Sequence, residues 1–434
     1  MDDNAKLIVS EDIFISQKGN KFLFLNPNIP DWLVVNNNGA YILNKCDGKN
    51  SINNIVQHAS ELGGGETEGE ARDLLAQAQK HSIITSTKAG KNNSLKKMPD
   101  PSKQSLRIVH LKLTDECNLR CKYCYAKSGG KSSILSFEEL TQLTLEVNSL
   151  SPFVEFVLSG GEPLLHPHCL DFAELVKSKG NEAHLLSNGT LINGTNAGRI
   201  AECCDLIKIS LDGATEKTHS LTRGANNYFK VAKAIDLLNK HDANVLIAMT
   251  VTRRNLHEIP KLVERYGSQL TFQPFFHAGR GSSHTDLALT GKEYYDALYS
   301  TPGVNPMGAI EKVLSRARTR GIFKCAIGDS EISISHNGDV FPCQMLDDPL
   351  FLAGNVHETP LQEIYNKSKV LEEVRQLNVN NIKGCESCPV RLICGGACRA
   401  RTFHENGEIQ ISGNFCEYER LAYINGIFDS VSID

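Results

Sequence analysis

Residues 114–125 read Thr-Asp-Glu-Cys-Asn-Leu-Arg-Cys-Lys-Tyr-Cys-Tyr and contain three cysteines in a C-x3-C-x2-C spacing: Cys117, Cys121 and Cys124. Three thiolates on one short loop can each hold one iron of a [4Fe–4S] cluster, which leaves the fourth iron without a protein ligand. A small molecule can bind and react at such an open iron. A zinc site would need a fourth His or Cys nearby, and none follows before His166.

Strands and helices alternate outward from this loop. Apolar strand-like runs occupy residues 107–114, 153–158, 182–186, 206–211, 245–251 and 270–275. Helical patterns separate them at residues 136–150, 169–180, 197–204, 228–241 and 256–266. The alternation predicts an α/β fold with a parallel sheet covered by helices. Six strands are too few for an eight-fold barrel, so we expect an open, partial (β/α)6 barrel.

The polar motifs follow the first four predicted strands. In chain order they are the cysteine loop, Gly160-Gly161-Glu162, Ser187-Asn188-Gly189 and Asp212-Gly213. The carboxyl ends of parallel barrel strands meet at one rim, where barrel enzymes carry their chemistry. We therefore expect these motifs to surround one site.

Composition excludes several classes of protein. The 434 residues suit two or three domains, and the net charge of −4 gives no footprint for nucleic acid or an anionic membrane. The N-terminus lacks the basic and apolar segments of a secretion signal, and no apolar run approaches the ~20 residues of a membrane span. We expect a cytoplasmic protein.

The 14 cysteines are clustered, which favours metal ligation over disulfides. Seven follow residue 324 and three lie in the loop described above. Four are scattered and are expected to be buried as small apolar side chains: Cys46, Cys169, Cys203 and Cys204.

The cysteine loop, with Tyr123 directly before its last cysteine, and the run Ser159-Gly160-Gly161-Glu162-Pro163 resemble the radical S-adenosylmethionine (SAM) superfamily. The resemblance covers about residues 107–315. It implies that the open iron chelates SAM, and that reductive cleavage of SAM yields a 5′-deoxyadenosyl radical that abstracts hydrogen. The paired glycines would permit close backbone approach, and Glu162 would accept a hydrogen bond from the SAM ammonium.

The same resemblance assigns further SAM contacts. Ser187 and Asn188 would meet the ribose, and Ser210 would point into the same cavity. Arg223 resembles the arginine that pairs with the SAM carboxylate, a task that suits a bidentate guanidinium. A surface ion pair for Arg223 and a turn role for Asn188 are the alternatives. Asp212, before a glycine, is interpreted as a turn former.

The seven C-terminal cysteines resemble the SPASM domain, which binds two auxiliary [4Fe–4S] clusters, so residues 316–434 form the predicted third domain. By this resemblance one set holds an inner cluster with one ligand missing: Cys325, Cys343 and Cys398. The other set holds an outer cluster: Cys385, Cys388, Cys394 and Cys416. Thiolate-rich zinc ribbons are the alternative.

Position 344 departs from one branch of the family. Sulfatase-maturing relatives carry an Asp directly after the equivalent of Cys343 and use it as a base. Gln344 cannot accept a proton as a carboxylate does, so the departure argues against formylglycine formation. His277, near the end of the sixth strand, is a weak candidate for a base.

Residues 1–88 form a separate predicted unit, joined to the barrel by a polar linker at 89–106. Short β-prone runs precede helical patterns at residues 38–45, 51–62 and 68–82. The pattern is similar to winged-helix-like, PqqD-like domains that add a leader peptide to the edge of a three-stranded sheet. The only tryptophan, Trp32, is expected in the core.

The combined resemblance predicts a maturase of a ribosomal precursor peptide that installs a thioether or another crosslink. It implies SAM, three [4Fe–4S] clusters and a low-potential donor such as flavodoxin or ferredoxin. A protein side chain, as in sulfatase maturation, and a tetrapyrrole precursor are alternative substrates. A non-catalytic electron carrier or peptide scaffold is a further alternative, which the SAM motifs disfavour.

Overall fold

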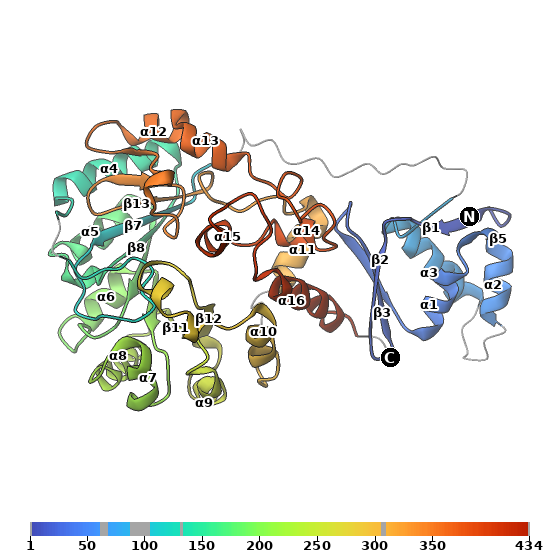
Figure 1. Cartoon of the computed structure of the whole chain (residues 1–434), viewed down its shortest axis with the longest axis horizontal. Helices are drawn as coiled ribbons and strands as arrows, with labels where there is room; N and C mark the ends of the chain where they lie inside the picture. The colour runs from blue at the N-terminus through green and yellow to red at the C-terminus, as the bar shows by residue number, and fades with distance from the viewer. Residues whose placement is uncertain (1, 61–67, 87–104, 131–132, 305–309, 433–434) are drawn as a thin grey trace.

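The computed structural model describes residues 2–60, 68–86, 105–130, 133–304 and 310–432. The described chain is elongated, with an N-terminal unit at one end and a barrel at the other (Figure 1). The last C-terminal segments, coloured red, lie between the two, and orange segments lie along the barrel. Of the predicted linker 89–106, all but residues 105 and 106 fall outside the described part.

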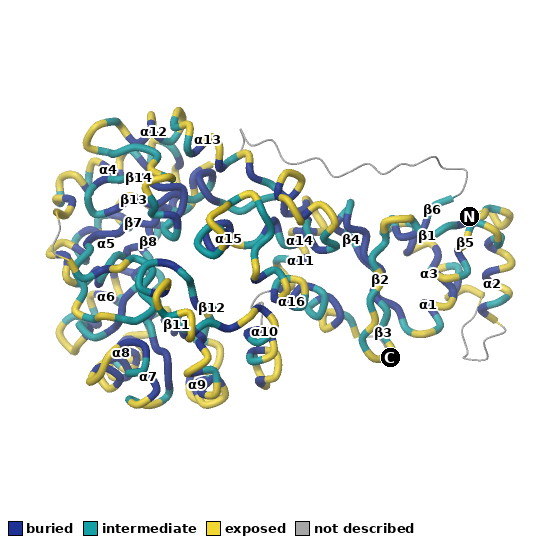
Figure 2. Tube along the Cα trace, viewed as in Figure 1, coloured by how far each residue is buried: buried dark blue, intermediate teal, exposed yellow. Residues whose placement is uncertain are grey.

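A curved parallel sheet forms the barrel and confirms the predicted α/β class. Its strands are hydrogen-bonded in chain order: β7 (Ile108–Thr114), β8 (Glu155–Gly160), β9 (Glu182–Ser187), β10 (Leu206–Ser210), β11 (Val245–Val251) and β12 (Leu270–Pro274). Five covering helices match the predicted ones: α4 (Phe137–Leu150), α5 (Cys169–Ser178), α6 (Ala197–Cys203), α8 (Tyr228–Lys240) and α9 (Ile259–Tyr266). The core between sheet and helices is apolar and fully buried (Figure 2).

One further barrel helix, α7 (Glu216–Arg223), is absent from the sequence interpretation. It begins at Thr215, whose side chain accepts a hydrogen bond from the Thr218 backbone, and ends before Gly224 at a φ of 91°. None of its four buried residues is aliphatic, so the sequence lacks the apolar 3.6-residue period that indicates a helix. They are Thr218, His219, Thr222 and Arg223.

The C-terminal region extends the barrel sheet beyond the predicted boundary at residue 316. Strand β13 (Glu331–Ile334) pairs in parallel with β7, and β14 (Asp339–Phe341) and β15 (Gly354–Asn355) continue the sheet in antiparallel fashion. The helices from residue 291 onward are α10 (Gly291–Tyr299), α11 (Ile310–Arg320), α12 (Leu361–Lys367), α13 (Lys369–Arg375), α14 (Arg391–Cys394), α15 (Arg399–Asn406) and α16 (Cys416–Asp429). Three short β-strands therefore fasten the cysteine-rich region to the barrel.

The N-terminal unit contains two small sheets. One is an antiparallel three-stranded sheet of β2 (Phe14–Lys18), β3 (Lys21–Asn26) and β4 (Asp31–Val35), and these strands contain the predicted β-prone runs. The other joins β1 (Lys6–Val9), β5 (Asp47–Ser51) and β6 (Ile84–Ser86). The predicted helices are α1 (Asn37–Asn44), α2 (Ile52–Ser60) and α3 (Glu68–Lys80), and residues 61 and 62 of the second prediction fall outside the described part.

Both faces of the β2–β3–β4 sheet are covered. One face packs against helices of its own unit, and the other packs against α11, α14 and α16 through Leu23, Leu25, Trp32 and Val34. Trp32 is 4% exposed and lies under the Arg318 guanidinium, 4.1 Å from the ring centre. The core placement predicted for Trp32 is confirmed, and the core it joins lies between two parts of the chain.

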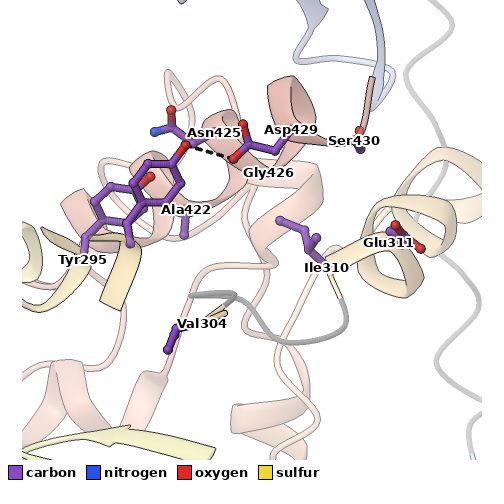
Figure 3. A pocket seen from close by; sticks show the side chains of 10 residues that line it. Tyr295, Val304, Ile310, Glu311, Ala422, Asn425, Gly426, Asp429 and Ser430 are labelled. Atoms are coloured by element: carbon purple, nitrogen blue, oxygen red, sulfur yellow. Dashed lines mark hydrogen bonds between the residues drawn. The ribbon is translucent and has the colours of Figure 1, made fainter. Parts of the chain in front are cut away.

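Polar contacts complete this junction. Asp429 of α16 accepts hydrogen bonds from Lys18 at the end of β2, at 2.6 Å, and from the Tyr299 hydroxyl, at 3.0 Å. A cavity of about 250 Å³ lies beside them, between α10, α11 and α16, with Tyr295 and Asn425 in its wall (Figure 3). The N-terminal unit is thus attached to the helix that begins at Cys416.

The four scattered cysteines are all buried, as predicted: Cys46, Cys169, Cys203 and Cys204. In the part of the chain that the structure describes, no helix combines the length and apolar character that crossing a bilayer requires.

Candidate active site

A cavity of about 560 Å³ opens at the carboxyl ends of the barrel strands, within the usual size range of ligand sites. Ten of the eleven predicted cluster-loop and SAM residues line it: Cys117, Cys121, Tyr123, Cys124, Gly160, Gly161, Ser187, Asn188, Ser210 and Arg223. The C-terminal region supplies further wall residues: Gln344, Met345, Cys398, Arg401 and Glu419. The predicted shared rim is therefore present, and it faces the cysteine-rich region.

The loop after β7 holds its cysteines through backbone contacts. The Leu119 N–H donates to the Cys117 sulfur at 3.4 Å, and Arg280 donates to the backbone oxygens of Cys121 and Ser128, both at 2.8 Å. Burial raises the pKa of Cys121 to about 11; the Arg223 charge opposes the shift, and Asp212 and the other two cysteines add to it. Free thiols that share a loop and face one cavity suit a cluster that takes one thiolate per iron.

Gly160 and Gly161 allow the cysteine loop to lie directly on the next strand. A Cβ on Gly160 would lie 2.3 Å from the Thr114 oxygen, and one on Gly161 would lie 2.1 Å from the Glu116 oxygen. Gly160 also has a φ of 130°, which side chains rarely adopt. The close backbone approach predicted here is present, and the loop itself makes it.

Glu162 is fully buried and is not one of the residues that line the cavity. Its carboxylate accepts hydrogen bonds from the Ser187 hydroxyl and the Asn188 backbone, both at 2.8 Å. Burial raises the pKa of Glu162 to about 7, although these hydrogen bonds oppose the shift. Glu162 therefore lies behind the residues that line the cavity, and it holds two predicted SAM contacts, Ser187 and Asn188, in position.

Asn188 connects the β9 end to the cysteine loop, because its amide donates to the Asn118 side chain at 2.9 Å. Asn118 in turn donates to Thr190 at 2.8 Å. The turn role considered for Asn188 is also present, since its side-chain oxygen accepts from the Thr190 backbone at 2.9 Å.

Asp212 is a buried carboxylate at the site whose contacts the sequence interpretation missed. It is fully buried, and its carboxylate accepts hydrogen bonds from Arg223 Nε at 2.9 Å, the Thr222 hydroxyl at 2.8 Å and the Tyr123 hydroxyl. The Thr250 backbone N–H donates to its other oxygen at 3.1 Å. Arg223 is thus a buried, paired cation at the cavity wall, and the surface ion pair considered for it is wrong.

The C-terminal cysteines interact electrostatically in two groups. Burial, and then the negative charge of Cys398, raise the pKa of Cys325 to about 12. Burial, and then Glu331, raise the pKa of Cys343, and Cys325 and Cys398 contribute in the same direction. Burial raises the pKa of Cys385 to about 11, with Arg399 opposing the shift and Cys416 and Cys388 adding to it. Burial, then Glu419 and then Cys416, raise the pKa of Cys394. Each of these pairs belongs to one of the two ligand sets that the SPASM resemblance implies, and the assignment of all seven ligands stays a prediction.

Backbone N–H groups also point at these sulfurs. Ala397 donates to the Cys394 sulfur at 3.1 Å, and Arg401 and Met345 donate to Cys398 and Cys343, both at 3.5 Å. Such hydrogen bonds tune cluster potentials. Among the described residues no three Cys, His, Asp or Glu side chains are grouped so as to hold a single metal ion.

His277 lies outside the main cavity. It lines a neighbouring space of about 410 Å³ together with His404 and Glu405, and burial lowers the pKa of His277. Gln344 does line the main cavity, where it accepts a hydrogen bond from the Tyr125 hydroxyl at 3.3 Å. His277, the residue considered as a base, therefore lies away from the rim. Gln344, the residue that departs from the sulfatase-maturing relatives, lies on the rim.

Two family profiles match the chain. The radical SAM superfamily profile matches residues 111–266, and the iron–sulfur cluster-binding SPASM profile matches residues 325–389. These domains imply [4Fe–4S] clusters and SAM.

Two curated relatives show the range of chemistry among similar chains. An AdoMet-dependent heme synthase of Methanosarcina barkeri is 29% identical over 349 residues, which cover 72% of this chain and 96% of the relative. The mycofactocin maturase MftC of Mycobacterium tuberculosis is 28% identical over 314 residues, which cover 67% and 78%.

Solved structures share the fold. Native anSMEcpe with bound AdoMet and Cp18Cys peptide superposes with a TM-score of 0.61 at 21% identity, covering 75% of this chain and 98% of that chain. Streptococcus suis SuiB bound to precursor peptide SuiA gives 0.56 at 14% identity, covering 94% and 98%. The second match extends over the N-terminal unit as well as the barrel.

Proposed function

Because this chain carries a radical SAM domain followed by a SPASM domain, we propose that it is a maturase of a ribosomally synthesised peptide, an oxidoreductase that installs a thioether or another crosslink. The observation that carries the proposal is the shared cavity, in which the first cysteine triad and Cys398 of the C-terminal region line one space. A peptide segment that enters this space would contact both cysteine-rich regions.

The chain's own residues prepare the SAM site. Cys117, Cys121 and Cys124 hold the cluster, and Asp212 orients the Arg223 guanidinium by binding its Nε edge. Arg223 also lines the cavity, so its charge is available to a carboxylate. When bound, the cluster and SAM supply a carbon-centred radical that removes a hydrogen atom from the substrate.

The C-terminal cysteines hold two auxiliary clusters, which brings the count to three. We assign Cys325, Cys343 and Cys398 to the inner cluster, and Cys385, Cys388, Cys394 and Cys416 to the outer one. Electron acceptance is the chemistry that such clusters supply. The inner set provides three thiolates, which leaves one position for another ligand.

The N-terminal unit recognises the precursor in this proposal, as a PqqD-like domain. Of its two outer strands, β2 offers an edge, and Ile15 on β2 is 48% exposed, whereas the Trp32 backbone oxygen on β4 accepts a hydrogen bond from Arg318 at 2.7 Å. An extended leader can add a strand to such an edge through backbone hydrogen bonds. Contacts of β2 with α16 connect this domain to the cavity region.

Partners and conditions follow from the cofactors. Reduction of the SAM-binding cluster needs a low-potential donor such as flavodoxin or ferredoxin. Exposed clusters lose iron in air, so we place the enzyme in an anaerobic or microaerobic cytoplasm. Iron loss on exposure of the purified protein to air tests this assignment.

A tetrapyrrole substrate is the second candidate, favoured by the similarity to the AdoMet-dependent heme synthases. The leader-binding role proposed for the N-terminal unit argues for a peptide, and the match to that relative covers 72% of this chain. Gln344 in place of an acidic residue disfavours a sulfatase-type reaction.

The experiment is anaerobic co-expression of the enzyme with the short peptide encoded beside its gene, followed by high-resolution mass spectrometry. A loss of two hydrogens per event, absent with Cys121→Ala, supports the proposal. An unchanged peptide, with SAM still cleaved, refutes the peptide assignment.

A further inference from the structure

Two polar side chains on the inner wall of the barrel have no role in the proposed SAM site. Ser159 lies on β8, directly before the paired glycines, and Lys208 lies on β10. The strand register aligns Leu158 with Leu185 and Leu185 with Ile207. The next residues along the three strands form one row, and all of them line the cavity: Ser159, Leu186 and Lys208.

Lys208 is a cation without a counter-charge. It makes no ion pair or hydrogen bond with any residue that the structure describes, and burial lowers its pKa. Three other cations line the cavity and each is bound to the protein: Arg223 to Asp212, Arg280 to the Cys121 backbone and Arg401 to the Phe275 backbone. Among the four cations of the described wall, Lys208 is therefore the one without a protein partner, whereas Arg223 is assigned to the SAM carboxylate in the proposed function.

Ser159 is also unsatisfied. Its side-chain oxygen is buried and has no hydrogen-bond partner among the described residues, and the residue is 4% exposed. A buried hydroxyl without a partner is costly, and native proteins rarely tolerate one without a reason. A cation and a hydroxyl donor in one row suit a carboxylate, which has two oxygens to accept from them.

The charge of the wall points to the same kind of ligand. Among the described residues that line the cavity, Glu419 is the one carboxylate, against four cations. The SAM carboxylate would be satisfied by Arg223 in the proposed function. Lys208 lies two residues before Ser210 on β10, about 7 Å further toward the amino ends of the strands. An anion at Lys208 therefore comes from a different molecule.

We propose that Ser159 and Lys208 bind a carboxylate of the precursor peptide, either an acidic side chain or the C-terminal carboxylate, and so fix the segment to be modified. This inference rests on the proposed function. It names the chemical feature that a substrate of this cavity must have, namely a negative charge near the reacting residue.

The test measures binding of the peptide encoded beside the gene to the reconstituted holoenzyme by isothermal titration calorimetry without air. The peptide is used in its natural form, with a C-terminal amide, and with each Asp or Glu replaced by Asn or Gln. The enzymes are wild type, Lys208→Met, Lys208→Arg and the control Lys233→Met, which removes an exposed lysine of α8.

We expect Lys208→Met to weaken binding of the natural peptide about 10- to 100-fold, Lys208→Arg to restore much of it, and Lys233→Met to change nothing. One of the neutralised peptides should bind the wild-type enzyme with an affinity lowered by the same factor. That peptide and the natural peptide should bind Lys208→Met with equal affinity. The amide identifies the C-terminus, and the Asn or Gln forms identify a side chain.

Two results overturn the inference. Equal affinity of wild type and Lys208→Met for the natural peptide shows that Lys208 binds no carboxylate. Equal losses with every peptide form, neutralised or not, show that Lys208 acts only on the fold. If wild type modifies the peptide in either case, the proposed function survives; if wild type neither binds nor modifies it, both fail.

Discussion

Replacement of Asp212 by asparagine tests the buried network that holds Arg223. Three donors converge on one oxygen of Asp212, and the Thr250 backbone N–H donates to the other. An asparagine side chain has one accepting oxygen, so in either orientation its NH₂ group faces at least one donor. The change also leaves the Arg223 guanidinium buried without its counter-charge.

Removal of one partner from a buried ion pair costs about 3 to 5 kcal/mol. Local opening of α7 and the β11 end should therefore become about a hundredfold to several thousandfold more frequent. Hydrogen exchange followed by mass spectrometry measures this opening in peptides that contain Arg223 and Thr250. The control is Asp286→Asn, because Asp286 pairs with Arg254 at 2.8 Å on the surface.

An exposed pair contributes at most about 1 kcal/mol, so exchange near Asp286 should rise less than tenfold. Equal, small increases in both variants would refute the assignment of Asp212 as the anchor of Arg223. The turn role inferred from Asp212-Gly213 would then be sufficient.

Three further predictions follow. Gly161→Ala places a Cβ against the Glu116 backbone. This change should lower the free energy of unfolding by about 1 to 3 kcal/mol and reduce the iron bound at the cysteine loop. Burial raises the pKa of Glu162 from 4.5 to about 7, so the folded state holds this proton more tightly. The free energy of unfolding should thus fall by up to about 1.4 kcal/mol per pH unit as the pH rises through that window, and Glu162→Gln should remove that slope in urea titrations. Leu25→Ala should cost about 2 to 5 kcal/mol in unfolding followed by the fluorescence of Trp32, the only tryptophan.

Matched variants make these predictions refutable. Gly194→Ala adds a Cβ with no atom within 4 Å, so it should keep normal iron content and stability. Leu350→Ala removes a side chain that is 72% exposed and should leave the Trp32 transition unchanged. Loss of iron with Gly194→Ala, an unchanged pH slope in Glu162→Gln, or equal effects of the two leucine variants would each contradict the reasoning.

The barrel and most of its rim could be predicted from the sequence because their signals are local. Each predicted strand is a short apolar run, and the cysteines and glycines stand at spacings that carry chemistry without reference to distant residues. Residues 331–334 gave no such signal, because β13 is four residues long and its pairing with β7 joins positions more than 200 residues apart.

The buried polar groups could not be predicted in the same way. Asp212 and Gly213 have the form of a turn, and only the fold brings the donors Tyr123 and Thr222 to one carboxylate oxygen. Likewise, Lys208 within an apolar strand gives no sign in the sequence that its counter-charge is missing.

The central claim is that a peptide is oxidised in the cavity that the two cysteine-rich regions share. Incubation of the reduced holoenzyme with unlabelled SAM and a perdeuterated precursor peptide tests it most directly. The account predicts one deuterium in the released 5′-deoxyadenosine per event and a peptide that has lost that carbon-bound deuterium. A second deuterium is lost only where the new bond joins two carbons, because a thiol or hydroxyl hydrogen exchanges with water. Release of 5′-deoxyadenosine without deuterium, from a peptide of unchanged mass, would contradict it.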